Sequence, residues 1–491
     1  MQIILKTGNP TDTQTLILPV FQDEKLAENL QKIAETYNLS QDRLTRDFKA
    51  DFKEIHSFYA SESKIILLGL GKNAGQKEVI RAFRWLFYCH KTKFSQTTSI
   101  DLQDFTTKSV ENVINGVLLG GYDIKLYKTE KKTENNFFFN QPVIEVFVDE
   151  NRLIEAEKSI SAGQVTAETQ MRVMDLVNAP ANKKIPQTLV NFATESGSDF
   201  GFEVKVFNQE QLKALGFEAL LAVGQGSHNP PFCIVMEYKP ENAGAHLKKI
   251  GLVGKGITFD TGGVSIKDSL NLHMMKSDMG GAAAVLGAME LAAKMQLPVH
   301  LIGIVPTAEN SVDALAFKPS DVIGSYSGKT IEIIDTDAEG RLILADALAY
   351  LTKNYQTETI IDLATLTGSV IATLGYAAAG MFTKNDELAH KLLKISLETG
   401  EKLWRLPLWD DYKDELNSDI ADVKNHHSKP IAGAIVAAKF LEVFTHNHPA
   451  WVHLDIAGTS FADSEFSSMR SATAFGVRLL IDFLKAETDL S

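Results

Sequence analysis

Residues 335–342 have the sequence Asp-Thr-Asp-Ala-Glu-Gly-Arg-Leu, which places three carboxylates and a guanidinium in one short stretch. This octapeptide follows an apolar, β-like run at residues 330–334 and precedes apolar residues at helical spacing, from Leu342 to Ala349. It is therefore predicted to be a strand-to-helix turn. Carboxylates crowded at such a turn repel one another and lose solvation unless a cation compensates them. Acidic residues also cap helix N-termini, so the octapeptide alone leaves a cap and a metal site both open.

Composition limits the classes of protein to which the chain can belong. With 491 residues it is too long for one ordinary hydrophobic core, so two or more domains are expected. Its hydrophobic fraction of 44% and charged fraction of 23% are those of a soluble globular protein. A net charge of −13 argues against a nucleic-acid partner bound through its phosphates. The most basic stretch is interrupted by acidic residues and is expected to be a solvated loop; its lysines are Lys125, Lys128, Lys131 and Lys132.

Cysteine usage and hydropathy indicate a cytoplasmic protein. The two cysteines, Cys89 and Cys233, each lie in or beside an apolar run. Two cysteines exclude a disulfide framework and disfavour a thiolate metal site, so both thiols are expected to be buried and inert. No run of about 18 apolar residues is present, so no membrane span is expected. The N-terminus lacks a basic segment followed by a long apolar stretch, so no signal peptide is expected either.

Alternating strand and helix patterns predict an α/β fold with two domains, residues 1–160 and 161–491. In the first domain, residues 64–70 and 143–148 are predicted strands and residues 76–90 a helix. A long helix at residues 151–177 is predicted to connect the domains. Each domain is expected to contain a mostly mixed or parallel sheet flanked by helices. The strands predicted in the second domain are residues 203–207, 233–238, 250–254, 299–305, 359–363 and 451–456.

Two further glycine-rich segments carry charged residues where an apolar strand ends. They are residues 253–263, Val-Gly-Lys-Gly-Ile-Thr-Phe-Asp-Thr-Gly-Gly, and residues 274–281, Met-Met-Lys-Ser-Asp-Met-Gly-Gly. Glycine lets the backbone approach a ligand closely. Ligands of open α/β sheets bind just outside the carboxyl ends of the strands. The octapeptide has the same placement after its own strand, so the three segments are candidates for one site.

Convergence of the three turns would form a single cluster of carboxylates and lysines: Asp260, Asp278, Asp337, Glu339, Lys255 and Lys267. Four negative charges at one place require at least two divalent cations, and oxygen-rich ligation suits Mn, Mg or Zn. A carboxylate can bridge two such metals, and a hydroxide between them is a ready nucleophile. Lys255 could bind a metal only as a neutral amine, which requires a strongly lowered pKa. A salt bridge to a neighbouring carboxylate is the alternative role for each lysine.

Other catalytic arrangements are weak or absent in the sequence. Neither a His-Glu-x-x-His helix nor a Gly-x-Ser-x-Gly turn occurs. His453 and Asp455 share a face of one apolar strand and are predicted to be buried, hydrogen-bonded structural residues. The pair His426-His427 lies in a polar loop and is predicted to be solvated. The stretch Gly69-Leu-Gly-Lys72 lacks the spacing of a phosphate loop and is predicted to be a strand-end turn.

These segments together closely resemble the leucyl aminopeptidase family, the cytosol aminopeptidases. The resemblance extends in order over about residues 165–491, whereas the N-terminal third resembles the family only in pattern. Besides the three segments above, its motifs are Asn178-Ala-Pro-Ala-Asn182, Val223-Gly-Gln-Gly-Ser227, Ala364-Thr-Leu-Thr-Gly368, Trp404-Arg-Leu-Pro407 and His453-Leu-Asp-Ile-Ala-Gly-Thr459.

The resemblance implies a homohexameric enzyme whose larger C-terminal domain holds two divalent metals, usually Zn or Mn. Carried over by motif, the metal ligands are Lys255, Asp260, Asp278, Asp337 and Glu339. Asp260 and Glu339 would bridge the metals, and Lys267 would polarise the scissile carbonyl and stabilise the oxyanion. Arg341 would hold a bicarbonate that acts as general base, with the backbone at Leu366 facing the same anion. The pocket for the first substrate side chain would be lined by Met275, Thr365 and Gly368.

One residue departs from the family pattern, because members usually have Asn where this chain has Asp335. The change adds a negative charge two residues before the proposed ligand Asp337. A carboxylate that pointed into the site would shift metal affinity, whereas Asp and Asn are close substitutes as turn caps. Every proposed ligand and both catalytic side chains are present, so we interpret Asp335 as a turn cap.

The sequence as a whole predicts an aminopeptidase that removes N-terminal residues from peptides, favouring leucine and other apolar residues. One metal would hold the free amine of the substrate, which explains the restriction to N-termini. The first alternative is a DNA-binding or interaction role on the same scaffold, which the intact ligand set opposes. The second is another two-metal hydrolase, for example one acting on phosphate esters. Lys255 as a ligand and Arg341 as an anion holder fit peptide hydrolysis better.

Overall fold

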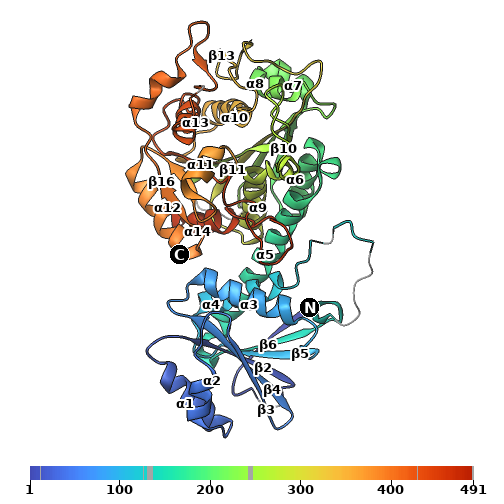
Figure 1. Ribbon diagram of the computed structural model, residues 1–491, viewed down its shortest axis with the longest axis vertical. Coiled ribbons are helices and arrows are strands. Elements are labelled where there is room, and N and C mark those ends of the chain that lie inside the picture. The colour runs from blue at the N-terminus through green and yellow to red at the C-terminus, as the bar shows by residue number, and fades with distance from the viewer. Residues whose placement is uncertain (11–12, 125, 130–135, 241–246, 428, 489–491) are drawn as a thin grey trace. The chain divides into compact units, whose positions relative to one another are not determined.

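The computed structural model describes residues 1–491 except 11–12, 125, 130–135, 241–246, 428 and 489–491. The chain forms two compact units, Met1–Met171 and Arg172–Ser491 (Figure 1). The boundary between them lies in helix α5, Leu153–Asn178, as does the domain boundary at residue 160 that the sequence predicts. Lys125, Lys131 and Lys132 of the predicted basic stretch lie outside the described residues. Within those residues, no helix combines the length and apolarity needed to cross a membrane.

The first unit is a sheet with helices on both faces. Its strands are β1 (Gln2–Lys6), β2 (Thr15–Phe21), β3 (Ile55–Ala60), β4 (Ser63–Gly71), β5 (Thr97–Asp101) and β6 (Val143–Phe147). Its helices before α5 are α1 (Leu26–Thr36), α2 (Gln41–Asp47), α3 (Gln76–His90) and α4 (Thr107–Leu119). Across the described residues the strand order is β1-β6-β5-β2-β4-β3, parallel except for β3 against β4. One apolar cluster lies under α1 and α2 and another under α3 and α4, which explains the continuous apolar runs of the central strands.

Two local predictions for the first unit have opposite outcomes. The glycines at residues 69 and 71 end strand β4 in a turn, as predicted: Gly71 has a φ of +80°, and a Cβ at Gly69 would lie 2.1 Å from the carbonyl oxygen of Asp51. The prediction of a buried thiol is wrong for Cys89, which is exposed. Cys89 lies in the last turn of α3, beyond the last buried residue of that helix, Phe87.

The second unit is built on a larger mixed sheet. Its strands are β7 (Glu203–Phe207), β8 (Phe232–Tyr238), β9 (Lys249–Gly254), β10 (Gly256–Asp260), β11 (His300–Asn310), β14 (Thr359–Ala364), β15 (Ala379–Phe382), β16 (Leu403–Arg405) and β18 (Trp451–Asp455). In the part of the chain that the structure describes, their order is β16-β15-β18-β14-β9-β11-β8-β7, and β10 also pairs with β11. The central neighbours β18, β14, β9 and β11 are parallel, whereas β7, β8 and β15 pair antiparallel. Each strand predicted for this domain is present, which confirms the α/β class with a mixed sheet.

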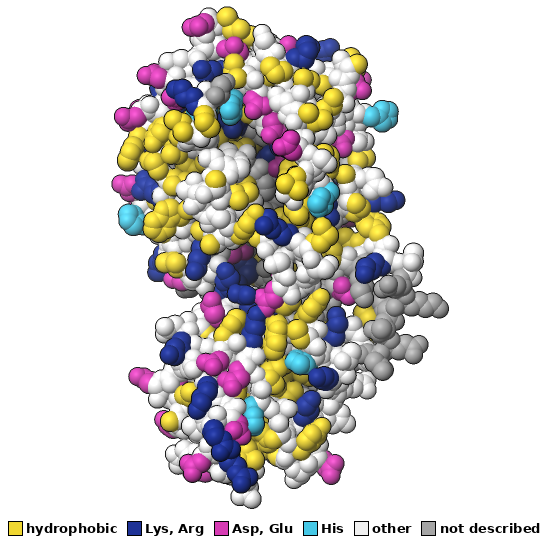
Figure 2. All heavy atoms as spheres, in the orientation of Figure 1, with side chains coloured by type: hydrophobic (Ala, Val, Ile, Leu, Met, Phe, Trp, Pro, Cys, Tyr) yellow, Lys and Arg dark blue, Asp and Glu magenta, His cyan; other side chains and the backbone are white. Residues whose placement is uncertain are grey.

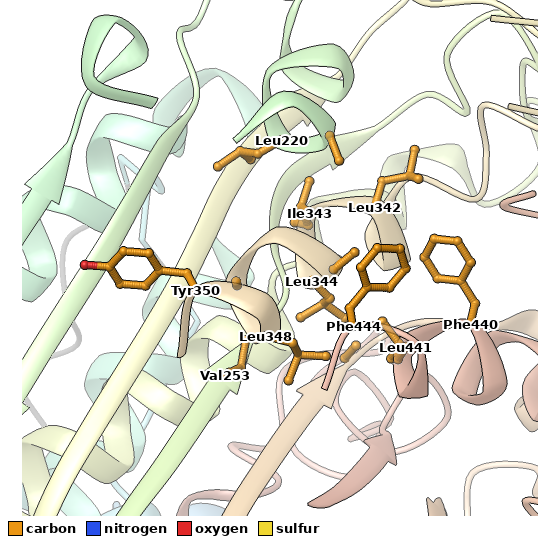
Figure 3. Packing of buried hydrophobic residues seen from close by; sticks show 14 of the residues in the cluster. Leu220, Val253, Leu342, Ile343, Leu344, Leu348, Tyr350, Phe440, Leu441 and Phe444 are labelled. Atoms are coloured by element: carbon orange, nitrogen blue, oxygen red, sulfur yellow. The ribbon is translucent and has the colours of Figure 1, made fainter. Parts of the chain in front are cut away.

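Helices cover both faces of the larger sheet. They are α6 (Pro186–Phe200), α7 (Gln209–Leu215), α8 (Glu218–Gly224), α9 (Gly280–Lys294), α10 (Gly340–Asn354), α11 (Gly368–Leu374), α12 (Asp386–Thr399), α13 (Gly433–Glu442) and α14 (Val477–Glu487). On one face, Leu344 and Leu348 of α10 lie between Val253 of β9 and the end of α13 (Figure 3). Leu441 belongs to the last turn of α13, and Phe444 lies just beyond that helix. Successive residues of β9 point to opposite faces, so Gly254 meets α9 on the other side of the sheet.

The octapeptide follows a strand of a separate small sheet rather than of the larger one. Strands β12 (Val322–Ile323), β13 (Ile331–Glu332) and β17 (Val423–Lys424) form this three-stranded sheet of described residues. Only two residues of the run predicted at 330–334 are in β13. Beyond this strand, the backbone amides of Ile334 and Asp335 donate to the side chain of Asn425 rather than to a neighbouring strand. Helix α10 begins at Gly340, inside the octapeptide.

Close packing of α9 against the strand ends fixes where Asp278 lies. A Cβ at Gly281, the second residue of α9, would lie 2.0 Å from the carbonyl oxygen of Leu363 in β14. A Cβ at Gly254 of β9 would lie 2.5 Å from the carbonyl oxygen of Gly281. Only glycines allow this approach, which brings the residues before α9 to the carboxyl ends of β9 and β14.

Gly281→Ala is therefore expected to destabilise the second unit, although alanine has the higher helix propensity by about 1 kcal/mol. A methyl group 2.0 Å from a carbonyl oxygen cannot be accommodated, so helix and strand must separate. A loss of about 1–3 kcal/mol in the free energy of unfolding is expected from chemical denaturation. Gly368→Ala is the control, because its Cβ would meet nothing within 4 Å. Unfolding of Gly281→Ala at the same or a higher denaturant concentration than the parent would contradict this packing.

Candidate metal centre

The three charged segments converge at the carboxyl ends of the central strands, as the sequence predicts. Asp260 is the last residue of β10, and Asp278 follows the short 3₁₀ helix η4, Leu272–Ser277. Asp337 and Glu339 lie in the turn before α10. Asp260, Asp337 and Glu339 each offer an oxygen, and these atoms all lie within 4.8 Å of one another. Three carboxylates from two distant segments thus meet at one point.

Lys255 joins Asp278 to this group. Its Nζ lies 2.9 and 2.8 Å from the two carboxylate oxygens of Asp278 and 2.9 Å from Oε1 of Glu339. It also donates to the carbonyl oxygen of Thr365 at 2.9 Å. The lysine side chain is only 3% exposed. Burial opposes the charged amine, but the carboxylates of Asp278 and Glu339 outweigh it and raise the pKa of Lys255. Here Lys255 forms the salt bridges that were the alternative to metal ligation.

Lys267 pairs with the two carboxylates of the cluster to which Lys255 forms no ion pair among the described residues. Its Nζ lies 2.8 Å from Oδ2 of Asp260 and forms an ion pair with Asp337. The loop that carries it turns back at Gly262 and Gly263, with φ of +89° and +65°, so that the backbone amide of Lys267 donates to the carbonyl oxygen of Thr261 at 2.9 Å. The Lys267 side chain is 24% exposed. This lysine therefore borders solvent, whereas Lys255 does not.

Burial and mutual repulsion both disfavour charge on the carboxylates. Desolvation, followed by the neighbouring carboxylates, raises the pKa values of Asp278, Asp337 and Glu339. Oε2 of Glu339 is buried and has no hydrogen-bond partner among the described residues. Glu339 thus has a buried carboxylate oxygen without a partner among those residues and offers an oxygen within 4.8 Å of oxygens from Asp260 and Asp337, which suits a divalent cation. The residues present therefore fit divalent metal ions.

Neutral side chains hold the carboxylates in place, a role that the sequence interpretation missed: it named Thr365 only as a pocket residue and did not name Asn310. Nδ2 of Asn310 donates to Oδ1 of Asp260 at 2.8 Å and to the carbonyl oxygen of Thr336 at 3.1 Å. The hydroxyl of Thr365 donates to Oδ1 of Asp278 at 2.8 Å. Asn310 is the last residue of β11, the strand beside β9. The rule that ligands bind at the carboxyl ends of strands, which identified the other site residues, also applies to Asn310.

Asp335 caps the turn, as predicted. Its Oδ1 accepts a hydrogen bond of 2.9 Å from the backbone amide of Asp337, two residues on. This is the local bond that Asp and Asn make equally well. The Asp335 side chain thus stabilises the turn that carries Asp337 and Glu339.

Arg341 lies in the first turn of α10, buried beside this cluster. Its Nη1 donates to the carbonyl oxygen of Asn425 at 2.7 Å, and its Nε has no hydrogen-bond partner among the described residues. Burial lowers the pKa of Arg341 to about 10, so the guanidinium remains charged at neutral pH. The backbone amide of Leu366, predicted to face an anion here, donates to Oδ1 of Asp455 at 3.1 Å.

The histidine predictions have different outcomes. His453 and Asp455 are buried and hydrogen-bonded, as predicted: Nδ1 of His453 lies 2.5 Å from Oδ1 of Asp362, and Asp455 accepts from the hydroxyl of Thr367 at 2.7 Å. The prediction of a solvated pair is wrong for His427. Its side chain is buried, and its ring is in contact with the chain rather than with water: Nε2 lies 2.6 Å from the carbonyl oxygen of Ile431.

Two of the three predicted substrate-pocket residues, Thr365 and Met275, contact Asp278 of the cluster. Thr365 contacts Asp278 directly, as described above. Met275 lies in η4, half-buried, and its carbonyl oxygen accepts from the backbone amide of Asp278 at 3.2 Å. Gly368 begins α11 and is exposed, with open space where a side chain would project.

A pair of lysines ties η4 to the motif at residues 178–182. The Nζ of Lys184 donates to the carbonyl oxygen of Lys276 in η4, and the Nζ of Lys276 donates to the carbonyl oxygen of Asn178 at 2.9 Å. Lys184 is fully buried, and burial lowers its pKa to about 7. No sequence signal distinguishes Lys184 from its exposed neighbour Lys183, so this tie could not be predicted.

Two family models match the chain. The catalytic domain of the cytosol aminopeptidase family matches residues 171–481, and the N-terminal domain of the same family matches residues 17–131. This chain belongs to the cytosol aminopeptidase family. Family membership confirms the resemblance seen in the sequence and makes the protein a peptidase of the metallo-aminopeptidase class.

Relatives match over nearly the whole chain. A probable cytosol aminopeptidase of Chlorobium phaeobacteroides is 41% identical over 458 residues, 90% of each chain. That of Chlorobium limicola is 40% identical and covers 96% of this chain and 97% of its own length. Among solved structures, the bottromycin maturation enzyme BotP in complex with Mn has a TM-score of 0.83 at 29% identity, covering 97% of this chain and 99% of that one.

Asp337→Ala and Glu339→Ala are each expected to lose bound Mn, because each removes an oxygen from the group that lies within 4.8 Å. Calorimetric titration of the metal-free proteins with Mn measures the loss. Asp268→Ala is the control, since it removes an exposed carboxylate next to Lys267. Unchanged Mn binding in either cluster variant would refute the centre.

Proposed function

We propose that this protein is a two-metal aminopeptidase that removes the N-terminal residue of peptides, with leucine and other apolar residues preferred. The observation that carries the proposal is the largely buried cluster of carboxylates and lysines at the strand ends, which is open to solvent at Lys267 and Asp337. A peptidase family supplies the reaction class, and the cluster supplies the chemistry that such a reaction needs.

Five side chains would hold the metals: Lys255, Asp260, Asp278, Asp337 and Glu339. Lys255 would do so as a neutral amine, after giving up its ion pairs with Asp278 and Glu339. Mn is supported by the name of the BotP complex, Zn suits the same site, and Mg is a third candidate. Bound there, divalent ions would lower the pKa of a water molecule and polarise the scissile carbonyl. A free substrate amine would be held at the same centre, which restricts cleavage to N-termini.

The two lysines differ in what they can touch. Lys255 is 3% exposed and is enclosed by Asp278 and Glu339, whereas Lys267 is 24% exposed. Only Lys267 can approach a substrate carbonyl, so it would donate a hydrogen bond to the developing oxyanion. Met275, Thr365 and Gly368 would accept the first substrate side chain, and the open space at Gly368 supports that role.

Arg341 would hold a bicarbonate that accepts a proton from the attacking water. The guanidinium has an Nε without a partner among the described residues, and the start of α10 favours an anion. For the amide of Leu366 to donate to the same anion, it must exchange its hydrogen bond with Asp455.

We also propose a cytoplasmic homohexamer that acts on peptides with a free N-terminus. The names of the relatives, cytosol aminopeptidases, support the location. Hydrophobic side chains gather on parts of the second unit's visible surface (Figure 2). Large apolar side chains exposed on this unit include Trp404 at 62%, Trp409 at 64% and Ile431 at 65%, which suits subunit contacts.

The Mn-loaded protein is expected to hydrolyse leucine p-nitroanilide and to leave both N-acetyl-leucine p-nitroanilide and p-nitrophenyl phosphate intact. Release of nitroaniline or nitrophenol is followed by absorbance, with metal-free protein as the control. Turnover of the phosphate ester in place of the leucine anilide would favour the other class of two-metal hydrolase. Cleavage of the acetylated substrate at an equal rate would rule out an exopeptidase.

Lys267→Ala is expected to retain Mn yet raise the barrier of hydrolysis by about 2–4 kcal/mol, the effect of removing one oxyanion donor. That corresponds to a loss of roughly 30- to 1,000-fold in kcat. Steady-state kinetics measure kcat and Mn titration measures metal binding, both on the same preparation. Lys329→Ala, at an exposed lysine elsewhere in this unit, is the control. A fall in metal content with no change in kcat per bound metal would show that Lys267 is not the oxyanion donor.

A further inference from the structure

Asn425 occupies an unusual place beside the octapeptide. It directly follows β17, whose residues Val423 and Lys424 pair in parallel with Ile331 and Glu332 of β13. Its backbone amide donates to the carbonyl oxygen of Glu332 at 2.9 Å, which continues this pairing by one bond. The side chain is fully buried. The register of the small sheet therefore directs a buried amide at the start of the metal-ligand turn.

The side chain of Asn425 contacts both ends of that turn. At the first end, its Oδ1 accepts from the backbone amides of Ile334 at 2.8 Å and Asp335 at 3.3 Å. Its Nδ2 donates to the carbonyl oxygens of Asp335 at 2.6 Å and Ala338 at 3.5 Å. Asp337 lies between these anchor points and Glu339 directly follows them. One amide group thus satisfies backbone groups that would otherwise be buried and unpaired.

The backbone of the same residue holds Arg341. The carbonyl oxygen of Asn425 accepts the 2.7 Å hydrogen bond from Nη1 of Arg341. A movement of Asn425 would therefore displace the turn and the guanidinium together. Asn310 holds Asp260 from the other side but makes no such contact with Arg341 in the described residues.

We propose that Asn425 is a positioning residue that fixes Asp337 and Glu339 relative to Arg341, and so couples the metal centre to the anion-holding side chain. The inference rests on the proposed function, since it concerns how the metal ligands and Arg341 act together. The role requires an amide, because only an amide offers an acceptor to two N–H groups and donors to two carbonyl oxygens at this position. A carboxylate there would face the carbonyl oxygens of Asp335 and Ala338 and would add a further negative charge.

Asn425→Leu tests the role, because leucine has nearly the same shape, is uncharged and makes none of the four hydrogen bonds. Removing such a support around metal ligands typically costs about 10- to 100-fold in metal affinity or activity. We expect weaker Mn binding of that size by calorimetry, a lower kcat with an unchanged KM for leucine p-nitroanilide, and loss of any stimulation by added bicarbonate. Where the leucine variant does not fold, Asn425→Ser leaves space for water and is judged by the same criteria.

Asp422→Ala is the matched control on the same small sheet. Asp422 accepts from the backbone amide and hydroxyl of Thr330, at 2.8 and 3.0 Å, and so ties the other end of β13. It is exposed and does not touch the turn, so Mn affinity and kcat should stay within about twofold of the parent.

Equal losses in Asn425→Leu and Asp422→Ala would overturn the inference, because the effect would then come from the sheet alone. Parental Mn affinity and bicarbonate response in Asn425→Leu, or in the folded serine variant, would overturn it as well. Failure of the parent protein to bind Mn or to cleave the leucine anilide would instead count against the proposed function, so the two failures are distinguishable.

Discussion

The arrangement of the second unit around its candidate metal centre depends on holding four carboxylates close together at a largely buried site. Asp260, Asp278, Asp337 and Glu339 repel one another, and burial removes the water that would screen them. Positive charge must lie among them, and Lys255 and Lys267 provide part of it. Such an arrangement costs stability, because buried ion pairs seldom repay their desolvation. Its presence at the strand ends of a folded domain points to chemistry rather than to stability.

The fold brings these charges together with short, closely packed turns. Strand β10 continues the pairing of β9 along β11, so that Asp260 and Asn310 are partners at the end of these strands and Lys255 lies at the junction of β9 and β10, at the edge of the sheet where the site forms. Gly254 and Gly281 let α9 approach that edge so closely that Asp278 reaches Lys255. Asp337 and Glu339 come from a turn outside the larger sheet, so other residues must hold that turn in place. The small three-stranded sheet and Asn425 supply these supports.

Sequence reasoning reached the α/β class, the strands and the convergence of the charged segments, because each rests on local patterns. Apolar runs that end in glycine and a charged residue identify strand ends. The carboxyl ends of parallel strands lie at the same edge of a sheet, where ligands bind. The errors came from features that periodicity and residue type do not encode. The burial of His427 accompanies its contact with the carbonyl oxygen of Ile431, and Cys89 is exposed because it lies beyond the last buried residue of α3. The roles of Lys184 and Asn425 could not be predicted either, because each side chain donates to a backbone carbonyl oxygen about 90 residues away in the sequence.

The supporting residues suggest a rule for such a crowded site. Asn310, Thr365 and Asn425 position the charged groups without adding charge, since an amide or hydroxyl brings no further repulsion. Asp335 is the exception, and its place explains why it is tolerated. It is half-buried, its carboxylate accepts the amide of Asp337, and its charge favours the cationic form of Arg341. A carboxylate is acceptable at the rim of the turn, beside a guanidinium, whereas at Asn425 it would face two carbonyl oxygens. The neutral and acidic supports of this centre are therefore not interchangeable.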